Sequence, residues 1–280
     1  MRPLDPPIAK TLARVAARCE RWTVRIGSPT GPGWIPATTV VSHLDELITR
    51  VGEYYGTTDP AVTGTFFLKG YARGAASAAL ICLATERRVP DVAPSNVAFR
   101  FGSNGIVQEA ALAEPVFAAL PDDPDAKDPD AVVLPDVDAL RRWLRDRFVC
   151  GHLAGIVPLL RQRTRRGPHA LWATASDTCA KALALLAEIE GTLEAAGALD
   201  RETHAFLTTG PPLIDAPPLR PILHAGALSS GWRRITCCLA YRLPNHGLCM
   251  SCPCVSQDER DRRRHAELER LSRTASRLPT

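Results

Sequence analysis

Residues 59–88 read DPAVTGTFFLKGYARGAASAALICLATERR and form the most apolar helix-like stretch of the chain. Asp59 and Pro60 are typical of a helix start, because the Asp side chain accepts a free N–H of the first turn and Pro fits its first position. Gly70 is the place where we expect a break in this helix. The longest apolar run, 74–84, is too short to cross a bilayer. We therefore predict a buried helix.

Apolar residues at helical spacing predict further helices on both sides of this stretch. They are expected over 8–22, after a capping box of Ser42 and Asp45, over 140–156 with a kink at Pro158, over 168–189 and over 193–208. A second capping box, Ser256 and Glu259, opens a charged helix near the C-terminus. Helices therefore dominate the expected fold.

One β-hairpin is expected among these helices. Residues 96–102 and 106–113 are strand-like and flank the dipeptide Asn104-Gly105, which favours the positive φ angles of a tight hairpin turn. No alternation of strands and helices indicates a nucleotide-binding parallel sheet. The fold class that follows is mostly α with a small antiparallel β element, that is, α+β.

The chain is expected to divide into a long body and two short C-terminal parts. A helical body covers 1–230 and contains the hairpin at about 96–113 and an acidic, Pro-rich connection at 115–138, which we expect to be exposed. The aspartates of this connection lack the Gly of an EF-hand loop, which disfavours a hard-cation site. A compact cysteine segment follows at 231–256, and a charged helix or tail covers 257–280.

Composition narrows the class of protein. The chain has 280 residues, 45% of them hydrophobic and 23% charged, which is typical of a globular protein with a sizeable core and excludes general disorder. The net charge of +4 does not indicate a nucleic-acid partner. The first 22 residues carry charges and lack the apolar core of a secretory signal. We expect no transmembrane segment and a cytoplasmic protein, either free or peripheral at the inner face of the membrane.

The cysteines divide into two groups. Four are scattered singly in helix-like patterns, where small buried apolar residues are expected: Cys19, Cys82, Cys150 and Cys179. The other five lie between positions 237 and 254. In a reducing compartment such a cluster indicates metal binding rather than disulfides.

The clustered cysteines follow the pattern C-C-x10-C-x2-C within 233–254, RRITCCLAYRLPNHGLCMSCPC. Pro244, Asn245 and Gly247 can fold the chain back so that the adjacent pair meets the C-x2-C pair. Four thiolates suit either tetrahedral zinc or an iron–sulfur cluster. An adjacent Cys-Cys pair is unusual in zinc ribbons. A two-iron cluster is wider than a single zinc ion, so it better tolerates adjacent side chains that point apart. The chemistry favours iron–sulfur, with structural zinc and a redox or chance cluster as alternatives.

The run R-x-x-C-C-L-x-Y-R-L-P followed by L-C-x-x-C-P resembles the C-terminal signature of the FhuF-type ferric-siderophore reductases. Leu171-Trp172 adds a weaker similarity. The resemblance implies that Cys237, Cys238, Cys249 and Cys252 hold a [2Fe–2S] cluster. Cys254 falls outside the signature, and we expect it to point away from the cluster.

The resemblance also implies an activity. Such an oxidoreductase adds one electron to an Fe(III)-siderophore, and the product Fe(II) binds hard oxygen donors far less tightly and is released in the cytosol for iron acquisition. The implied partners are a ferric siderophore and an electron donor such as a ferredoxin or flavoprotein. A structural or interaction protein stapled by zinc on four cysteines, or an iron–sulfur sensor, are the alternatives.

Several neighbours of the cysteines are candidates for substrate binding. Arg233, Arg234, Arg242 and Tyr241 could face an anionic chelate, and ordinary solvated arginines with a packed Tyr are the alternative. His246 could ligate iron as in a Rieske centre, which four available cysteines make unnecessary. The arginines at 262–264 are balanced by acids, so we expect a solvated helix there.

Overall fold

The computed structural model describes residues 5–29, 31–224 and 226–275. Its α-helices are α1 (Pro7–Arg18), α2 (Leu44–Tyr55), α3 (Pro60–Glu86), α4 (Val137–Arg145), α5 (Ala154–Thr164), α6 (Pro168–Glu190), α7 (Leu193–Leu207) and α8 (Gln257–Ala275). Its strands are β1 (Val24–Ile26), β2 (Trp34–Pro36), β3 (Val89–Pro90), β4 (Val97–Phe101), β5 (Val107–Leu112), β6 (Phe117–Ala119), β7 (Ala131–Val133), β8 (Ile222–His224) and β9 (Ala227–Ser229). The α+β class expected from the sequence is confirmed, and positions 1–4 and 276–280 of the predicted parts lie outside the described residues.

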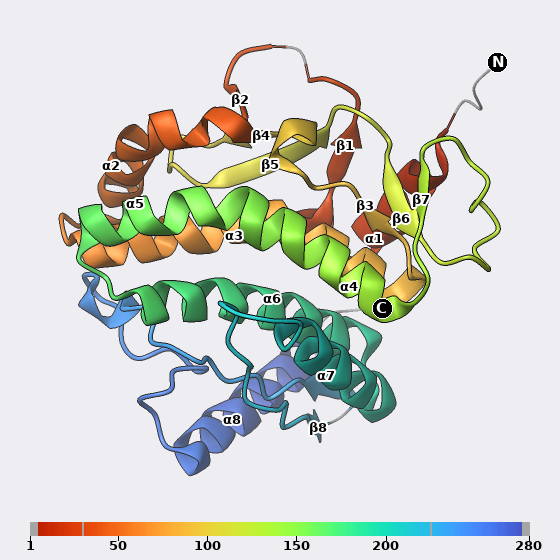
Figure 1. Cartoon of the computed structure of the whole chain (residues 1–280). Coiled ribbons are helices and arrows are strands. Elements are labelled where there is room, and N and C mark those ends of the chain that lie inside the picture. The colour runs from red at the N-terminus through yellow and green to blue at the C-terminus, as the bar shows by residue number, and fades with distance from the viewer. Residues whose placement is uncertain (1–4, 30, 225, 276–280) are drawn as a thin grey trace.

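Helix α3 lies in the middle of the molecule, between a small sheet and helix α6 (Figure 1). The Asp59 carboxylate caps it by accepting the Ala61 N–H at 2.9 Å, as the sequence predicted. The expected break at Gly70 is wrong, because the helix continues through this residue. A Cβ at Gly70 would lie only 2.5 Å from Cγ2 of Ile106 in the hairpin loop. The glycine therefore serves close packing against the hairpin, and it does not interrupt the helix.

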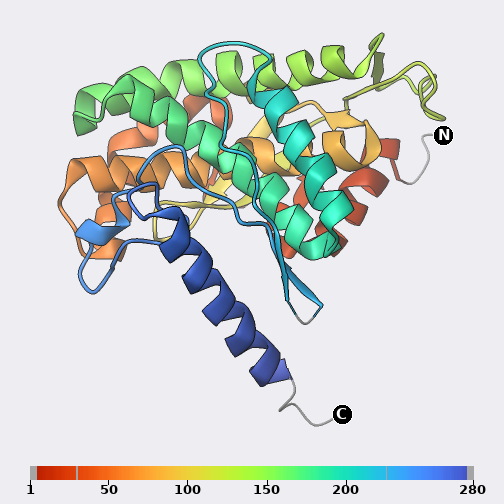
Figure 2. The same ribbon diagram turned by 90° about the horizontal axis from the view of Figure 1, so that it is seen from below.

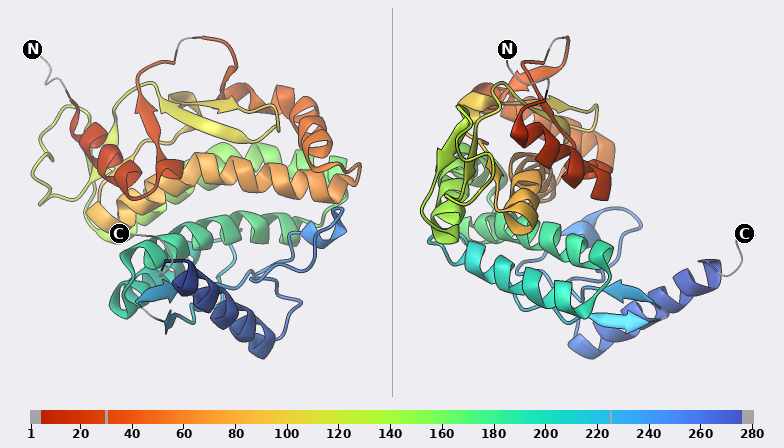
Figure 3. Two further views of the ribbon diagram at one scale, coloured as in Figure 1. Left: turned by 180° about the vertical axis from the view of Figure 1, so that it is seen from behind. Right: turned by 90° about the vertical axis from the view of Figure 1, so that its right-hand side faces the viewer.

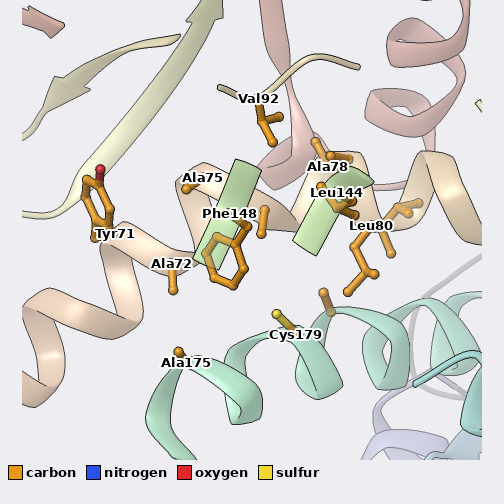
Figure 4. Packing of buried hydrophobic residues seen from close by; sticks show 14 of the residues in the cluster. Tyr71, Ala72, Ala75, Ala78, Leu80, Val92, Leu144, Phe148, Ala175 and Cys179 are labelled. Carbon is orange, nitrogen blue, oxygen red and sulfur yellow. The ribbon is translucent and has the colours of Figure 1, made fainter. Parts of the chain in front are cut away.

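Small side chains let α3 approach α6 closely. Figure 4 shows Ala72 and Ala75 of α3 opposite Ala175 and Cys179 of α6, with the Phe148 ring nearby, and all five residues are buried. Because interiors are close-packed, enlarging any of these side chains would force the two helices apart. This helix pair is the frame on which the rest of the molecule is built.

Helix α3 is also long and apolar enough to cross a membrane, judged by length and composition alone. Within the molecule, however, 78% of its apolar window is buried. It is therefore accounted for as the core helix that the sequence predicted.

The hairpin is present, but it belongs to a larger sheet than expected. Strands β4 and β5 pair antiparallel, while β1 joins β5 in parallel and β2 joins β4, giving the order β1-β5-β4-β2. Gly105 has a positive φ of 68°, whereas Asn104 does not and instead accepts the Ile106 N–H with its side chain at 3.1 Å. The sequence analysis predicted the hairpin but not the two strands beside it, because strands of three residues are too short to show an alternating pattern.

The sequence analysis expected the acidic connection at 115–138 to be exposed, but part of it packs against the body. It contains β6 and β7, which form a second sheet with β3. Asp123 is nearly buried and, together with Asp125, forms ion pairs with Arg88. Two of the clustered aspartates therefore hold this connection against the body. A third sheet, β8-β9, lies near the C-terminal segment.

Two helix boundaries differ from expectation. Ser42 does not cap α2, which starts at Leu44 after a 3₁₀ segment, η2 (Ala37–His43). Pro158 lies inside α5, and the irregularity precedes it as a π-helical segment, η4 (Asp146–Leu153). In η4 the buried His152 accepts the Tyr71 hydroxyl at 2.8 Å and donates to the Val92 carbonyl at 2.6 Å. Burial lowers the pKa of His152 to about 4.

After strands β8 and β9 the C-terminal part runs as a mostly irregular chain, with the short 3₁₀ turn η5 (Ala240–Arg242), before it enters α8. Figure 2 and the right-hand view of Figure 3 show α8 projecting away from the body. Ser256 caps this helix by accepting the Glu259 N–H at 3.3 Å, as predicted.

Candidate metal centre

The four cysteines of the predicted ligand set come together as two pairs. Cys237 and Cys252 have their Sγ atoms 4.0 Å apart. Cys238 hydrogen-bonds to Cys249, and this bond raises the pKa of Cys238 to about 12 and lowers the pKa of Cys249 to about 6. Each member of the adjacent Cys-Cys pair therefore has a different partner from the C-x2-C pair.

A left-handed residue explains how adjacent cysteines reach different partners. Leu239, directly after the pair, has a φ of 62°, which turns the chain sharply. Its N–H then points back to Sγ of Cys237 at 3.4 Å. The backbone N–H groups of Ala240 and Cys254 likewise hydrogen-bond to Cys238 and Cys252. Such donors stabilise sulfur that carries negative charge, so the loop suits thiolates that bind a metal.

The sequence analysis expected Cys254 to point away from the other cysteines, and this expectation is wrong. Its sulfur lies within 4.8 Å of the sulfurs of Cys237 and Cys252, although the residue is exposed. Cys254 thus joins the pair formed by Cys237 and Cys252.

The helical body holds the cysteine segment mainly through polar contacts. The buried Asp177 of α6 accepts the N–H groups of Ile235 and Thr236 at 2.7 and 3.3 Å. Burial raises the pKa of Asp177 to about 7. Arg166, just before α6, donates to the Cys237 carbonyl at 2.6 Å. The residues on either side of the first cysteine are therefore fixed by two side chains of the body.

Helix α8 holds the segment from the other side, which corrects the expectation of a solvated charged tail. Arg260 and Arg264 are each only 3% exposed. Arg260 donates to the carbonyls of Cys252 and Val255, and Arg264 donates to the Trp232 carbonyl at 2.6 Å. The two arginines are four residues apart and share one helix face. Sequence reasoning missed them because a guanidinium that binds carbonyls reads like any other surface charge.

The four residues predicted to bind substrate lie in three places. Arg242 is exposed and forms an ion pair with Asp59 at 2.9 Å, and Tyr241 next to it is 44% exposed. Arg233 is half-buried, on the side that faces Arg260. Arg234 is buried, stacks over the Trp232 ring at 4.8 Å and hydrogen-bonds toward Cys249. Arg234 lines a cavity, and the role of all four residues stays a prediction.

That cavity lies between α3 and α6 and has a volume of about 180 Å³. Besides Arg234 it is lined by Lys69 and Arg73 of α3 and by Lys181 of α6, which sequence reasoning did not single out. Burial lowers the pKa of Lys69 to about 8. A signal was available, since the chain has only four lysines and these two sit inside strongly apolar helices.

A family model described as "Ferric iron reductase FhuF-like transporter" matches residues 65–223, more than half of the chain. The chain belongs to the FhuF-like ferric iron reductase family. A second model, described as "FhuF 2Fe-2S C-terminal domain", matches residues 234–253. A search of curated proteins gave no match. The protein is thus an oxidoreductase with a ferric substrate. The first match lies within the helical body, and the second lies within the cysteine segment.

The match to the 2Fe–2S domain decides the choice between iron–sulfur and structural zinc in favour of iron–sulfur. The residues of this FhuF-like reductase fit such a group. Two thiol pairs match the need of two irons for two protein ligands each, and backbone N–H groups and nearby cations compensate the negative charge of the sulfurs. Cys237, Cys238, Cys249 and Cys252 would hold the cluster, and Cys254 lies close enough to compete with them.

Proposed function

We propose that this FhuF-like reductase acts on ferric siderophores and releases their iron as Fe(II). When bound, the cluster supplies one electron that converts the Fe(III) of the chelate to Fe(II), and an electron donor such as a ferredoxin or flavoprotein replaces it. Siderophores bind iron through hard oxygen donors, which hold Fe(II) far less tightly than Fe(III). The chain therefore needs to position a chelate, and the proposal requires no nucleophile or general base.

The observation that carries this proposal is the position of the cysteines at the surface. Cys237 and Cys249 are half-buried and Cys254 is exposed, while Cys238 and Cys252 are buried. A bulky ferric chelate can therefore approach the sulfur set without entering the core. Electron transfer needs proximity rather than enclosure, so this degree of exposure suits a chelate too large for a closed active site.

The protein side chains near the sulfurs have two tasks in this proposal. Arg166 and Arg234 place positive charge beside Cys237 and Cys249, which favours the more reduced and more negative state of the site. The polar contacts of Asp177 and Arg260 fix the loop so that the sulfurs keep their arrangement when the charge changes. We place the reaction in the cytosol or at the inner face of the membrane, where siderophore iron would be released.

The test is anaerobic reduction of the purified holoprotein followed by rapid mixing with ferric siderophores. We expect reoxidation of the cluster at a rate that rises with chelate concentration, together with Fe(II) trapped by a ferrous-specific chelator. The matched control is the Ga(III) complex of the same siderophore, which has the same shape and charge but accepts no electron. Equal reoxidation with the Ga(III) complex, or none with the Fe(III) complex, would exclude the proposed reaction.

A further inference from the structure

The cavity between α3 and α6 carries far more positive than negative charge. Its described lining includes the cations Arg21, Lys69, Arg73, Lys181 and Arg234. Asp177 provides its one carboxyl group among these lining residues, and both of its oxygens already accept backbone N–H groups. Among the described lining residues, the positive charge therefore exceeds the negative charge.

Three cations of this cavity form no direct ion pair with a carboxylate in the part of the chain that the structure describes. No carboxylate of the described residues lies within 4.0 Å of the charged groups of Lys69, Lys181 or Arg234. Arg234 is only 7% exposed, and its buried Nε has no hydrogen-bond partner among these residues. Lys69 rests against the Phe66 ring at 4.6 Å. A buried cation without a partner is costly, so the arrangement indicates an anion that arrives from outside.

The negative charge of the cysteine sulfurs accounts for only part of this excess. Arg234 hydrogen-bonds toward Cys249, and Lys69 interacts with Cys238 and Cys249. Lys181 lies near the cations Arg234, Arg21 and Arg73, and Glu188, the carboxylate near it, already accepts hydrogen bonds from Ser230. Arg73 lies near Arg21 and Tyr55 and donates to the Val107 carbonyl at 3.0 Å. The cavity thus has a floor that reaches the metal centre and a rim of exposed cations whose charge the sulfurs do not require.

Aromatic side chains form the walls between floor and rim. Trp22, Tyr55 and Phe66 line the cavity, together with Ile106 of the hairpin loop. A second cavity of about 390 Å³ shares Trp22, Tyr55, Arg73 and Ile106 with it and opens toward β5. Glu109 also lines this second cavity, where it pairs with Arg25 and Arg100. The two cavities together offer flat apolar surfaces and cations, which suits a ligand that combines rings or aliphatic arms with anionic oxygens.

We propose that this cavity binds an anionic ferric chelate, one whose carboxylate or catecholate oxygens face Lys69, Arg73, Lys181 and Arg234. This inference rests on the proposed function, because it names the substrate class of the same centre. Arg234 connects the two parts, since it lines the cavity and also hydrogen-bonds toward Cys249. The chelate is thereby held next to the metal centre by the side chain that also borders a sulfur.

The test is calorimetric titration of the oxidised holoprotein with redox-inert Ga(III) chelates. Ga(III)-tris-catecholate and Ga(III)-citrate represent the two anionic oxygen chemistries, and an uncharged Ga(III)-trihydroxamate is the neutral comparison. We expect Lys181→Gln and Arg73→Gln each to weaken an anionic complex about tenfold, with a smaller effect at high salt, and to leave the neutral complex within about twofold. Whichever anionic complex binds more tightly identifies the oxygen chemistry.

The matched controls are Lys127→Gln and Arg142→Gln, which remove cations elsewhere on the molecule. The visible spectrum of every variant must match that of the unaltered holoprotein, because the rim cations do not contact the cysteines. Equal loss of affinity for the neutral complex, or an unchanged affinity of the double variant Lys181→Gln/Arg73→Gln for both anionic complexes, would overturn the proposal.

The failure of this site and the failure of the proposed function give different results. If the anionic Ga(III) complexes bind but their Fe(III) counterparts do not reoxidise the reduced holoprotein, the site stands and the function is wrong. If neutral ferric trihydroxamate reoxidises the unaltered protein and the double variant at the same rate, while no anionic Ga(III) complex binds, the function stands and this site is wrong.

Discussion

Helices α3 and α6 pack through small, fully buried apolar side chains, whereas the cysteine segment at 231–256 has few of these and is held by polar contacts. Trp232 of this segment joins the main apolar core, and Leu239 and Leu243 form a separate small apolar cluster with Val62 of α3. Asp177 and Arg166 of the body add polar contacts, and Arg260 of α8 adds others from the opposite side. Hydrophobic burial therefore stabilises the body by itself, while the segment needs its polar contacts and its metal to keep one conformation.

The largest expected effect separates these two regions directly. Removing the cluster should loosen 231–256 and leave α3 and α6 folded, because the metal links both cysteine pairs of a segment that buries little apolar surface. We expect amide exchange in the segment to accelerate about 1,000-fold, with no change in the two helices. Hydrogen exchange of holoprotein and apoprotein measures this difference. Equal protection of the segment in both forms would show that the segment, like the body, keeps its fold without the cluster.

The second prediction concerns the contact between the two regions. Asp177→Ala removes the acceptor of two backbone N–H groups next to Cys237, which should destabilise the segment by about 2 kcal/mol. Exchange of the Ile235 and Thr236 amides would rise accordingly, while α3 stays protected. The matched control is Asp200→Ala, since Asp200 also accepts a backbone N–H, that of Leu219 at 2.9 Å, but lies away from the cysteines. If both variants act alike on the segment, Asp177 is not its anchor.

The third prediction assigns the cysteines. Cys249→Ser and Cys252→Ser should each lower the iron content of the purified protein about tenfold, because each removes one ligand of a pair. Cys254→Ser should keep the visible spectrum of the holoprotein, although its sulfur lies near Cys237 and Cys252. Iron analysis and the visible spectrum check both statements. Loss of the cluster in Cys254→Ser, with tolerance of Ser at position 237 or 238, would move the ligand set to positions 249, 252 and 254.

The smallest effect belongs to the body alone. The pKa of His152 is about 4 in the folded protein, below its usual value of about 6.5, so the unfolded chain binds a proton that the folded chain does not. Stability is therefore lost as the pH falls from 6.5 toward 4, by about 1 kcal/mol between pH 7 and 5.5. Chemical denaturation followed by far-UV circular dichroism should show a weaker pH dependence in His152→Gln. The exposed His169, changed to Gln, should leave the dependence as it is.

The sequence was sufficient for the parts of the molecule that repeat a pattern. The apolar pattern of α3 and α6 and the spacing of the clustered cysteines are local properties. The first predicted the buried helices, and the second predicted the iron–sulfur cofactor that the family match supports. Strands β1 and β2 were not predicted, because a strand of three residues is too short to show a hydrophobic period. The expectation for Cys254 failed because the direction of a side chain after Pro253 depends on the folded loop.

The polar parts of the site were hidden for a different reason. Lys69 and Lys181 lie more than 100 positions apart in the chain and meet only because α3 packs on α6. Arg260 and Arg264 alternate with acids, and nothing local distinguishes a guanidinium that binds carbonyls from one in water. Long-range packing decides these roles, so a single sequence does not display them.

The close contact between Gly70 and Ile106 has a consequence for which chelates can be accepted. Both residues line the cavity between α3 and α6, and no methyl group fits at position 70 while Ile106 keeps its place. Gly70→Ala would push the hairpin loop outward and widen one wall without changing any charge, which titration with Ga(III) complexes of graded size would measure. Different residues of one cavity thus select the size and the charge of the chelate. The missing Cβ of Gly70 limits the size.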